Sequence, residues 1–185
     1  MSTALLVMDV QQNIVSRYAS DAEYLPRVRR AIDAARRSGV RVIYVTVSFR
    51  QGFPEVSARN KSFSAIRQAG GFVAGDATAI PAAIAPAPGE VVVTKRRVSA
   101  FAGSDLDVVL RAGDVDTLVL TGIATSGVVL STLRQAADLD YKLIVLADAC
   151  LDGDAEVHRI LTEKVFPRQA DVLSVESWVQ QLPKS

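Results

Sequence analysis

Short apolar runs recur along the chain, and longer segments with apolar residues at helical spacing lie between them. The runs are apolar nearly throughout rather than alternating, which is typical of strands covered on both faces in a parallel sheet. We therefore predict six strands, at 4–8, 40–47, 90–94, 117–121, 142–147 and 170–173.

The segments between these runs predict helices at 21–38, 104–111, 125–139 and 154–165. The first has Ser20 or Asp21 as a cap and Gly39 as a stop, whereas 76–88, rich in alanine and proline, is an irregular approach to the third strand. Alternating strands and helices predict an α/β fold, a three-layer α/β/α single domain over 1–185. We expect a mostly parallel six-stranded sheet in the order 3-2-1-4-5-6, which brings the carboxyl ends of strands one, three and four together.

Composition narrows the class of protein. A hydrophobic share of 49% argues against disorder, and a net charge of +1 argues against nucleic acid as the main partner. The chain starts directly with a strand, without the pattern of a secretory signal, and no apolar run reaches the length needed to span a bilayer. Its single cysteine, Cys150, excludes an internal disulfide, and its single histidine, His158, excludes a multi-histidine metal site. We expect a cytoplasmic protein without a membrane partner, a metal or another cofactor.

Chemistry-bearing residues follow three of the predicted strands. Asp9 comes after the first, Lys95 after the third, and the turn 121–129 leads from the fourth into a helix. Ligands of parallel sheets bind at the strands' carboxyl ends, and a helix start offers unpaired N–H groups for an anion or an oxyanion. An acid, a base and a set of N–H donors for an oxyanion are thus expected at the carboxyl edge of the sheet. Val128 occupies the position where a nucleophile would be needed.

Four segments match a known family in order and spacing, over nearly the whole chain. They are Leu6-Val7-Met8-Asp9-Val10-Gln11, Lys95 with Arg97 and Ser99-Ala100-Phe101, Asp105-Leu106 with Leu110-Arg111, and Leu118-Val119-Leu120-Thr121-Gly122-Ile123-Ala124-Thr125. On these residues the chain resembles the isochorismatase-like hydrolases, also called the cysteine hydrolase family. The resemblance implies catalytic roles for Asp9 and Lys95 and a cis peptide between Ile123 and Ala124.

The same resemblance implies a catalytic cysteine three residues after the threonine of the turn, where this chain has Val128. The nucleophile is therefore not carried over, although true isochorismatases also lack it and keep the acid. The resemblance further implies contacts to substrate or oxyanion from Gln11, Ile123, Ala124, Thr125, Ser126, Gly127 and the backbone of Val128. Val47-Ser48-Phe49 lacks the Asp-x-His ligands of the metal-dependent nicotinamidases, which argues against that activity.

Each of these features also has an ordinary structural interpretation. Asp9 could be a loop acid or a helix cap, Lys95 could belong to a solvated basic cluster, and Thr125 could simply cap a helix. The hydroxyls nearest the missing nucleophile, at Ser126, Ser131 and Thr132, have no adjacent base in the sequence. We interpret His158 as a helix-surface residue and Cys150 as a buried small hydrophobe, with a displaced nucleophile as the alternative for Cys150.

The long polar stretch 49–72 directly follows the second strand and is interpreted as a lid over the site. Its Arg50, Arg59 and Asn60 suit an anionic ligand. Family members commonly form dimers or tetramers, so we expect a homo-oligomer. The terminal segment with Trp178, the only tryptophan, could serve that contact or pack on its own sheet.

Three functions follow from these features. The first is a hydrolase of a small substrate bearing a carbonyl or carboxylate group, with Asp9 and Lys95 as the acid/base pair and direct attack by water, as in vinyl-ether cleavage. The second is a small-molecule binding or regulatory module without catalysis. The third is an amidohydrolase that uses Cys150.

Overall fold

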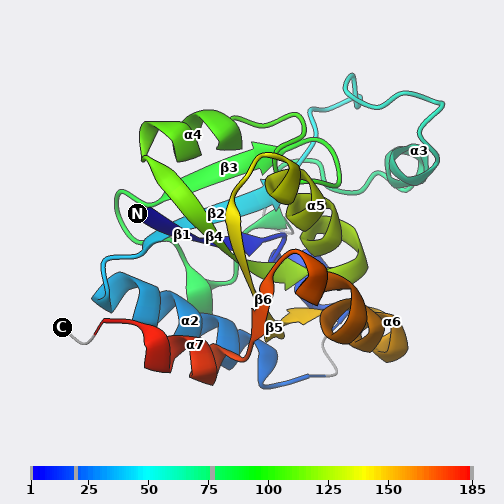
Figure 1. Cartoon of the computed structure of the whole chain (residues 1–185). Coiled ribbons are helices and arrows are strands. Elements are labelled where there is room, and N and C mark those ends of the chain that lie inside the picture. The colour runs from blue at the N-terminus through cyan, green and yellow to red at the C-terminus, as the bar shows by residue number, and fades with distance from the viewer. Residues whose placement is uncertain (1, 19–20, 76–77, 184–185) are drawn as a thin grey trace.

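A six-stranded parallel sheet forms the centre of the computed structural model, which describes residues 2–18, 21–75 and 78–183 (Figure 1). The order is β3-β2-β1-β4-β5-β6, and every neighbouring pair is parallel, as the sequence predicts. The strands are β1 (Ser2–Met8), β2 (Arg41–Val47), β3 (Val91–Lys95), β4 (Val115–Ile123), β5 (Lys142–Leu151) and β6 (Asp171–Leu173).

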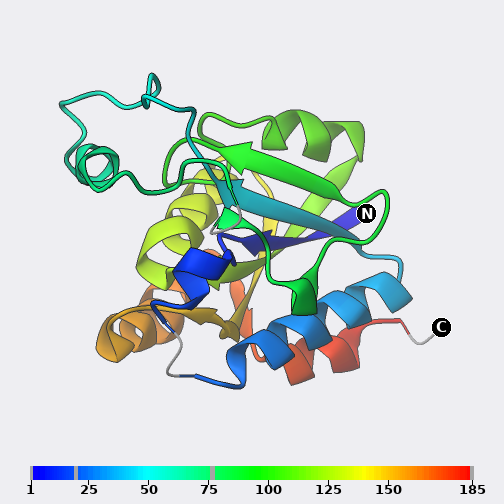
Figure 2. The same cartoon turned by 180° about the vertical axis from the view of Figure 1, so that it is seen from behind.

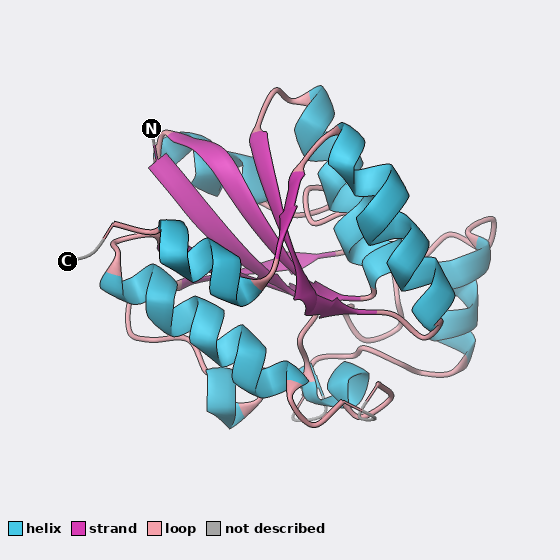
Figure 3. Cartoon of the chain, turned by 60° about the horizontal axis from the view of Figure 1, so that its bottom comes forward, coloured by secondary structure: helices cyan, strands magenta, loops and turns pink. Residues whose placement is uncertain are grey.

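Helices cover both faces of this sheet (Figure 3). The α-helices are α1 (Gln12–Val15), α2 (Tyr24–Arg37), α3 (Lys61–Gln68), α4 (Leu106–Ala112), α5 (Leu130–Asp138), α6 (Ala155–Ile160) and α7 (Val175–Gln181). The described residues also include two π-helices, η3 (Thr125–Val129) and η4 (Leu161–Val165), and the 3₁₀ turns η2 (Ala82–Ile84) and η5 (Phe166–Arg168). One buried cluster contains side chains of α2 and α7, and the other contains side chains of α4 and α5.

Side chains of β1 show why the strand sequences are apolar on both faces. Leu5 and Val7 join the cluster under α2 and α7, whereas Ala4, Leu6 and Met8 join the one under α4 and α5. All five are at most 2% exposed. Burial on both sides removes the need for a polar face, so these strands do not alternate.

Three predicted helices differ from the observed ones for local reasons. The first long helix begins at Tyr24 rather than at 21. The Asp21 carboxylate accepts the Glu23 N–H at 3.0 Å, and this forms a turn before the helix. The other predicted cap, Ser20, lies outside the described residues. The predicted helices 125–139 and 154–165 each contain a π-helical turn, at the start of the one and at the end of the other. The stretch 76–88 is irregular apart from η2, and residues 76 and 77 lie outside the described part.

The predicted fourth and fifth strands end too early. β4 runs to Ile123 and β5 to Leu151, because the two strands keep pairing beyond a register shift, where one residue of β4 between Leu120 and Gly122 faces residues 146–149 of β5. Gly122 pairs there with Cys150. Cys150 is therefore a strand residue inside the sheet.

Two further features concern surfaces. The 49–72 segment with α3 stands out from the sheet edge, as the two opposite views show (Figures 1 and 2). Helix α7 packs beside α2 (Figure 1). Trp178 is only 3% exposed, so the tryptophan packs in this chain's own core. Among the described helices, none is long and apolar enough to cross a membrane.

Candidate active site

Asp9 and Lys95 meet at the carboxyl edge of the sheet. The Asp9 N–H donates to Val45 O at 2.8 Å, and its φ of 57° turns the chain away from β1. Lys95 ends β3, which is separated from β1 by β2. Lys95 Nζ is 2.9 Å from Asp9 Oδ2, and the two side chains are 3% and 8% exposed. The predicted proximity of these residues is confirmed.

The ammonium group of Lys95 has its full set of acceptors. Besides Asp9, it donates to Arg97 O at 2.8 Å and to Val98 O at 3.1 Å. An ammonium group has three N–H donors, so a hydrogen bond to substrate would require it to give up one of these contacts. Lys95 thus links the acid to the loop that follows β3.

The Asp9 carboxyl group is held at one oxygen and free at the other. Oδ1 is buried and has no hydrogen-bond partner among the described residues. Burial raises the pKa of Asp9 to about 6, although the charge and the hydrogen bond of Lys95 oppose the rise. At this pKa the group exists in both protonation states near neutral pH, which suits general acid and base catalysis.

The turn after β4 lies directly beside Asp9, because Met8 pairs with Gly122. The expected cis peptide between Ile123 and Ala124 is present. Gly122 has φ of 145°, and a Cβ atom there would lie 2.2 Å from Met8 O, so only glycine fits. Val128 is 2% exposed and packs in the core under α4 and α5, so the turn carries no nucleophile at this position.

The predicted cradle of free N–H groups is partly occupied by the protein itself. Ser126 N–H donates to Asp152 Oδ2 at 2.7 Å. Gly127 N–H and Val129 N–H both donate to Ala124 O, at 3.1 and 3.3 Å. The Ser126 and Gly127 N–H groups are therefore engaged within the protein, and their contact with a substrate or an oxyanion stays a prediction.

Gln11 is completely buried and ties three segments together. Its Nε2 donates to Val47 O at 3.2 Å and to Thr78 O at 2.8 Å, while its Oε1 accepts the Val47 N–H at 2.8 Å. Both amide N–H donors are thus used within the protein. This side chain shapes the wall beside Asp9 rather than offering donors to a ligand.

The candidate lid residues make contacts within their own loop. Arg50 pairs with Glu55 at 2.6 Å, and Asn60 caps α3 by accepting the Phe63 N–H at 3.0 Å. Arg59 is exposed. The loop is connected to the site through Arg97, whose Nη2 donates to Glu55 O at 2.8 Å. A role of Arg50, Arg59 and Asn60 toward an anionic ligand stays a prediction.

Other candidate nucleophiles are poorly suited to attack. Cys150 is 2% exposed, burial raises the pKa of its thiol to about 12, and its Sγ lies 4.0 Å from Leu120 O. A thiol needs its ionised form to attack, so Cys150 is inert in this environment. Thr132 is also fully buried, and its hydroxyl accepts the Ala100 N–H at 2.9 Å. Ser126 and Ser131 are more accessible.

His158 is not the surface residue that the sequence suggests. It is half-buried, and its Nδ1 lies 2.8 Å from the Thr125 hydroxyl oxygen. The position of α6 gives a signal that sequence reasoning left unused, because this helix follows β5 at the same carboxyl edge as Asp9. The neighbouring polar residues of α6 hide that signal.

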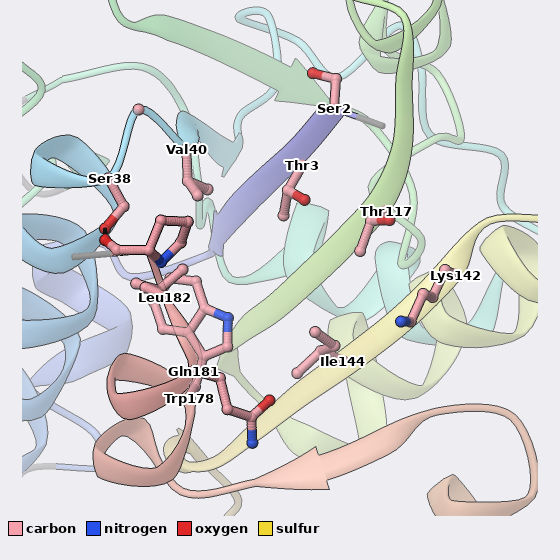
Figure 4. A pocket seen from close by; sticks show the side chains of 12 residues that line it. Ser2, Thr3, Ser38, Val40, Thr117, Lys142, Ile144, Trp178, Gln181 and Leu182 are labelled. Atoms are coloured by element: carbon pink, nitrogen blue, oxygen red, sulfur yellow. Dashed lines mark hydrogen bonds between the residues drawn. The ribbon is translucent and has the colours of Figure 1, made fainter. Parts of the chain in front are cut away.

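A cavity of about 500 Å³ lies at the opposite end of the sheet (Figure 4). Thr3, Thr117 and Lys142, near the beginnings of β1, β4 and β5, line it together with Trp178. It is therefore separate from the Asp9–Lys95 pair. Within the described ranges, no group of three or more histidine, cysteine, aspartate or glutamate side chains is arranged to hold a metal ion.

Comparison with known proteins gives consistent results. The Isochorismatase domain family matches residues 3–177. The ureidoacrylate amidohydrolase RutB of Stutzerimonas stutzeri (strain A1501) is 32% identical over 206 residues, covering 97% of this chain and 79% of the relative.

Two solved structures share the fold. A cysteine hydrolase from Pseudomonas syringae pv. phaseolicola 1448A has a TM-score of 0.90 at 26% identity, covering 97% of this chain and 92% of the other. The N-carbamoylsarcosine amidase from Thermoplasma acidophilum has a TM-score of 0.77 at 29% identity, covering 95% of this chain and 98% of the other.

Proposed function

Since the chain belongs to the isochorismatase family of hydrolases, we propose that it hydrolyses a small molecule by acid/base catalysis at Asp9 and direct attack of water. The observation that carries this proposal is the Asp9 carboxyl group, whose pKa is raised to about 6 by burial and whose Oδ1 is unpartnered beside a turn without a nucleophile. An acid of this kind can give a proton to substrate and take one from water.

The proposed reaction begins with protonated Asp9. Its Oδ1–H gives the proton to the vinyl carbon of an enol ether or to the leaving atom of an ester or amide, and the ionised carboxylate then accepts a proton from the attacking water. With an enol ether, water adds to the resulting oxocarbenium carbon, and the hemiketal collapses by moving its hydroxyl proton to the leaving alkoxy oxygen as the C–O bond breaks. One water is consumed, one C–O or C–N bond breaks, and Asp9 is protonated again at the end. With a pKa of about 6, about one tenth of Asp9 is protonated at pH 7, which is sufficient for turnover.

Lys95 supports this cycle without changing its own bonds. Its charge stabilises the ionised Asp9 that follows proton donation, and its three hydrogen bonds fix the carboxyl group so that Oδ1 stays toward the site. We assign Lys95 to holding the acid rather than to contact with substrate.

The relatives point to the class of substrate. The names of two of them contain ureidoacrylate and N-carbamoylsarcosine, both of which are small carboxylates with a ureido group. The thiol position of the family holds Val128 here, so no acyl-enzyme forms at that position. We propose that the substrate is a small carboxylate with a vinyl-ether, ester or ureido bond that water attacks directly.

The test is an activity panel of vinyl ethers, esters, amides and ureido acids. Wild-type protein is expected to hydrolyse at least one class with a rate that iodoacetamide leaves unchanged, and Asp9→Asn is expected to lose at least about a hundredfold in kcat. Val128→Cys and the matched Val128→Ala separate the two chemistries. Only the cysteine variant can form a covalent acyl-enzyme at position 128, which intact-protein mass spectrometry would detect. An undiminished rate in Asp9→Asn would contradict the proposal.

The occupied N–H groups of the turn favour a second candidate, a binding module that has lost catalysis. It predicts saturable binding of a panel carboxylate without turnover, measured by calorimetry. It also predicts that binding persists in Asp9→Asn.

A further inference from the structure

A second polar cluster lies on the other side of the turn from Asp9. The Thr125 hydroxyl oxygen is 2.8 Å from His158 Nδ1, and the Ser126 N–H donates to Asp152 Oδ2 at 2.7 Å. Thr125 and Ser126 are consecutive residues of the turn, while Asp152 and His158 both belong to the segment after β5. Two separate contacts therefore attach this segment to the beginning of η3.

The order of the strands defines what these contacts do. β4 lies between β1 and β5, with Met8 beside Gly122 on one side and Leu151 beside Ile123 on the other. Asp9 follows Met8, and Asp152 follows Leu151. The turn is thus flanked by the acid on its β1 side and by the His158–Asp152 segment on its β5 side.

Thr125 is suited to transmit position and unsuited to attack. It is completely buried, and its hydroxyl is already engaged by His158 Nδ1. It also directly follows Ala124 and begins a π-helix, a form that occurs mostly as single turns and frequently at functional sites. Fixing its side chain fixes the start of the turn.

We propose that His158 is a positioning residue. Through its contact with Thr125 it holds the turn after β4 in a fixed position relative to Asp9. This inference rests on the proposed hydrolase function. Burial lowers the pKa of His158, although the charge of Asp152 opposes the effect. This shift favours the neutral imidazole, which acts on Thr125 as a hydrogen-bonding group.

Four variants test the contact on whichever panel substrate the wild type hydrolyses. His158→Leu and Thr125→Val each remove the hydrogen bond and keep most of the volume, and their combination removes it from both sides. His158→Asn keeps a hydrogen-bonding group near the position of Nδ1. Arg159→Ala, on the exposed face of the same helix, is the control for α6 itself.

We expect kcat to fall about tenfold or more in each of His158→Leu and Thr125→Val, with KM changed less than twofold, because a shifted site lowers rate more than binding. The double variant should be no slower than the slower single variant, since one contact is lost in all three. His158→Asn should recover most of kcat, and Arg159→Ala should match the wild type. Losses that multiply in the double variant, or a His158→Leu enzyme with full kcat, would overturn the positioning role.

A second readout does not depend on activity. His158 is the only histidine, so isotope-labelled protein gives a single set of imidazole NMR signals. Thr125→Val should shift the Nδ1 resonance, whereas the Arg159→Ala control should not; an unchanged resonance in Thr125→Val would show that the contact is absent. Asp9→Asn separates the two proposals. Inactive Asp9→Asn beside fully active His158→Leu contradicts only the positioning role of His158. A wild type without turnover contradicts the hydrolase function, and the positioning role that rests on it.

Discussion

Asp9→Asn should change how the stability of this protein depends on pH. The asparagine side chain has nearly the shape of the aspartate but cannot ionise, so it mimics protonated Asp9 at every pH. The free energy of unfolding of the wild type, minus that of the variant, therefore isolates the cost of ionising Asp9 in its buried position. Any change in the contact with Lys95 adds a constant offset and leaves the pH dependence in place.

The magnitude follows from the two pKa values of Asp9. The pKa is about 6 in the folded protein against an ordinary value of 3.8, a difference of about 2.2. At about 1.36 kcal/mol for each unit, this corresponds to about 3 kcal/mol. Because the folded value lies above the unfolded one, the wild type has its full relative stability below pH 3.8 and loses it as the pH rises through 6. Between pH 4.5 and pH 7.5, the expected relative loss is about 2 kcal/mol.

Urea denaturation of both proteins at pH 4.5, 5.5, 6.5 and 7.5 measures this difference directly. The expected result is that the free energy of unfolding of Asp9→Asn rises relative to that of the wild type as the pH increases. This difference should become constant above pH 7. A gap that is constant with pH would show that Asp9 titrates normally in the folded state. A gap that moves the other way would mean that the ion pair with Lys95 outweighs the burial of the carboxylate.

Three further predictions follow from the same geometry. If protonated Asp9 is the acid, kcat/KM should fall about tenfold per pH unit above about pH 6, and a rate that instead rises there would assign Asp9 as a base only. The thiol of Cys150 should resist iodoacetamide in native protein at pH 8 and react in urea, and Cys150→Ala should keep full activity; fast labelling of the native protein would contradict its burial. Gly122→Ala should lower the free energy of unfolding by at least about 3 kcal/mol, because its Cβ would meet Met8 O, whereas Gly127→Ala, with 3.8 Å to its nearest neighbour, should cost much less in the same urea assay.

The sequence predicts the sheet well because its strands are buried on both faces and carry an unmistakable apolar pattern. It misses the extension of β5 to Leu151, because that extension depends on pairing with β4 beyond an irregularity. Cys150 is consequently placed after the strand by pattern and within it by structure. The π-helical start of η3 is hidden for a similar reason, since its residues are compatible with an ordinary helix.

The sequence likewise predicts one part of the candidate site and misses another. The meeting of Asp9 and Lys95 could be predicted because both end parallel strands, and such ends share one edge. The other two acceptors of the Lys95 ammonium group are the backbone oxygens of Arg97 and Val98, whose positions depend on the path of a loop. The contact between Thr125 and His158 joins residues 33 positions apart, and it forms only because α6 packs against the turn.

The cost of the Asp9–Lys95 pair is itself an argument for chemistry. A buried ion pair is weak grounds for stability, because removing two charges from water offsets much of their attraction, and apolar replacements are often neutral or stabilising. Here the cost is higher still, since one carboxylate oxygen is buried without a partner. At the neighbouring thiol position of the family, by contrast, Val128 packs in the core without such a penalty. A chain that needed only a folded binding pocket could have an apolar pair at positions 9 and 95 as well. The combination of an apolar residue at 128 and a strained, titratable acid at 9 is what direct water attack requires, and this is why we favour the hydrolase over the binding module.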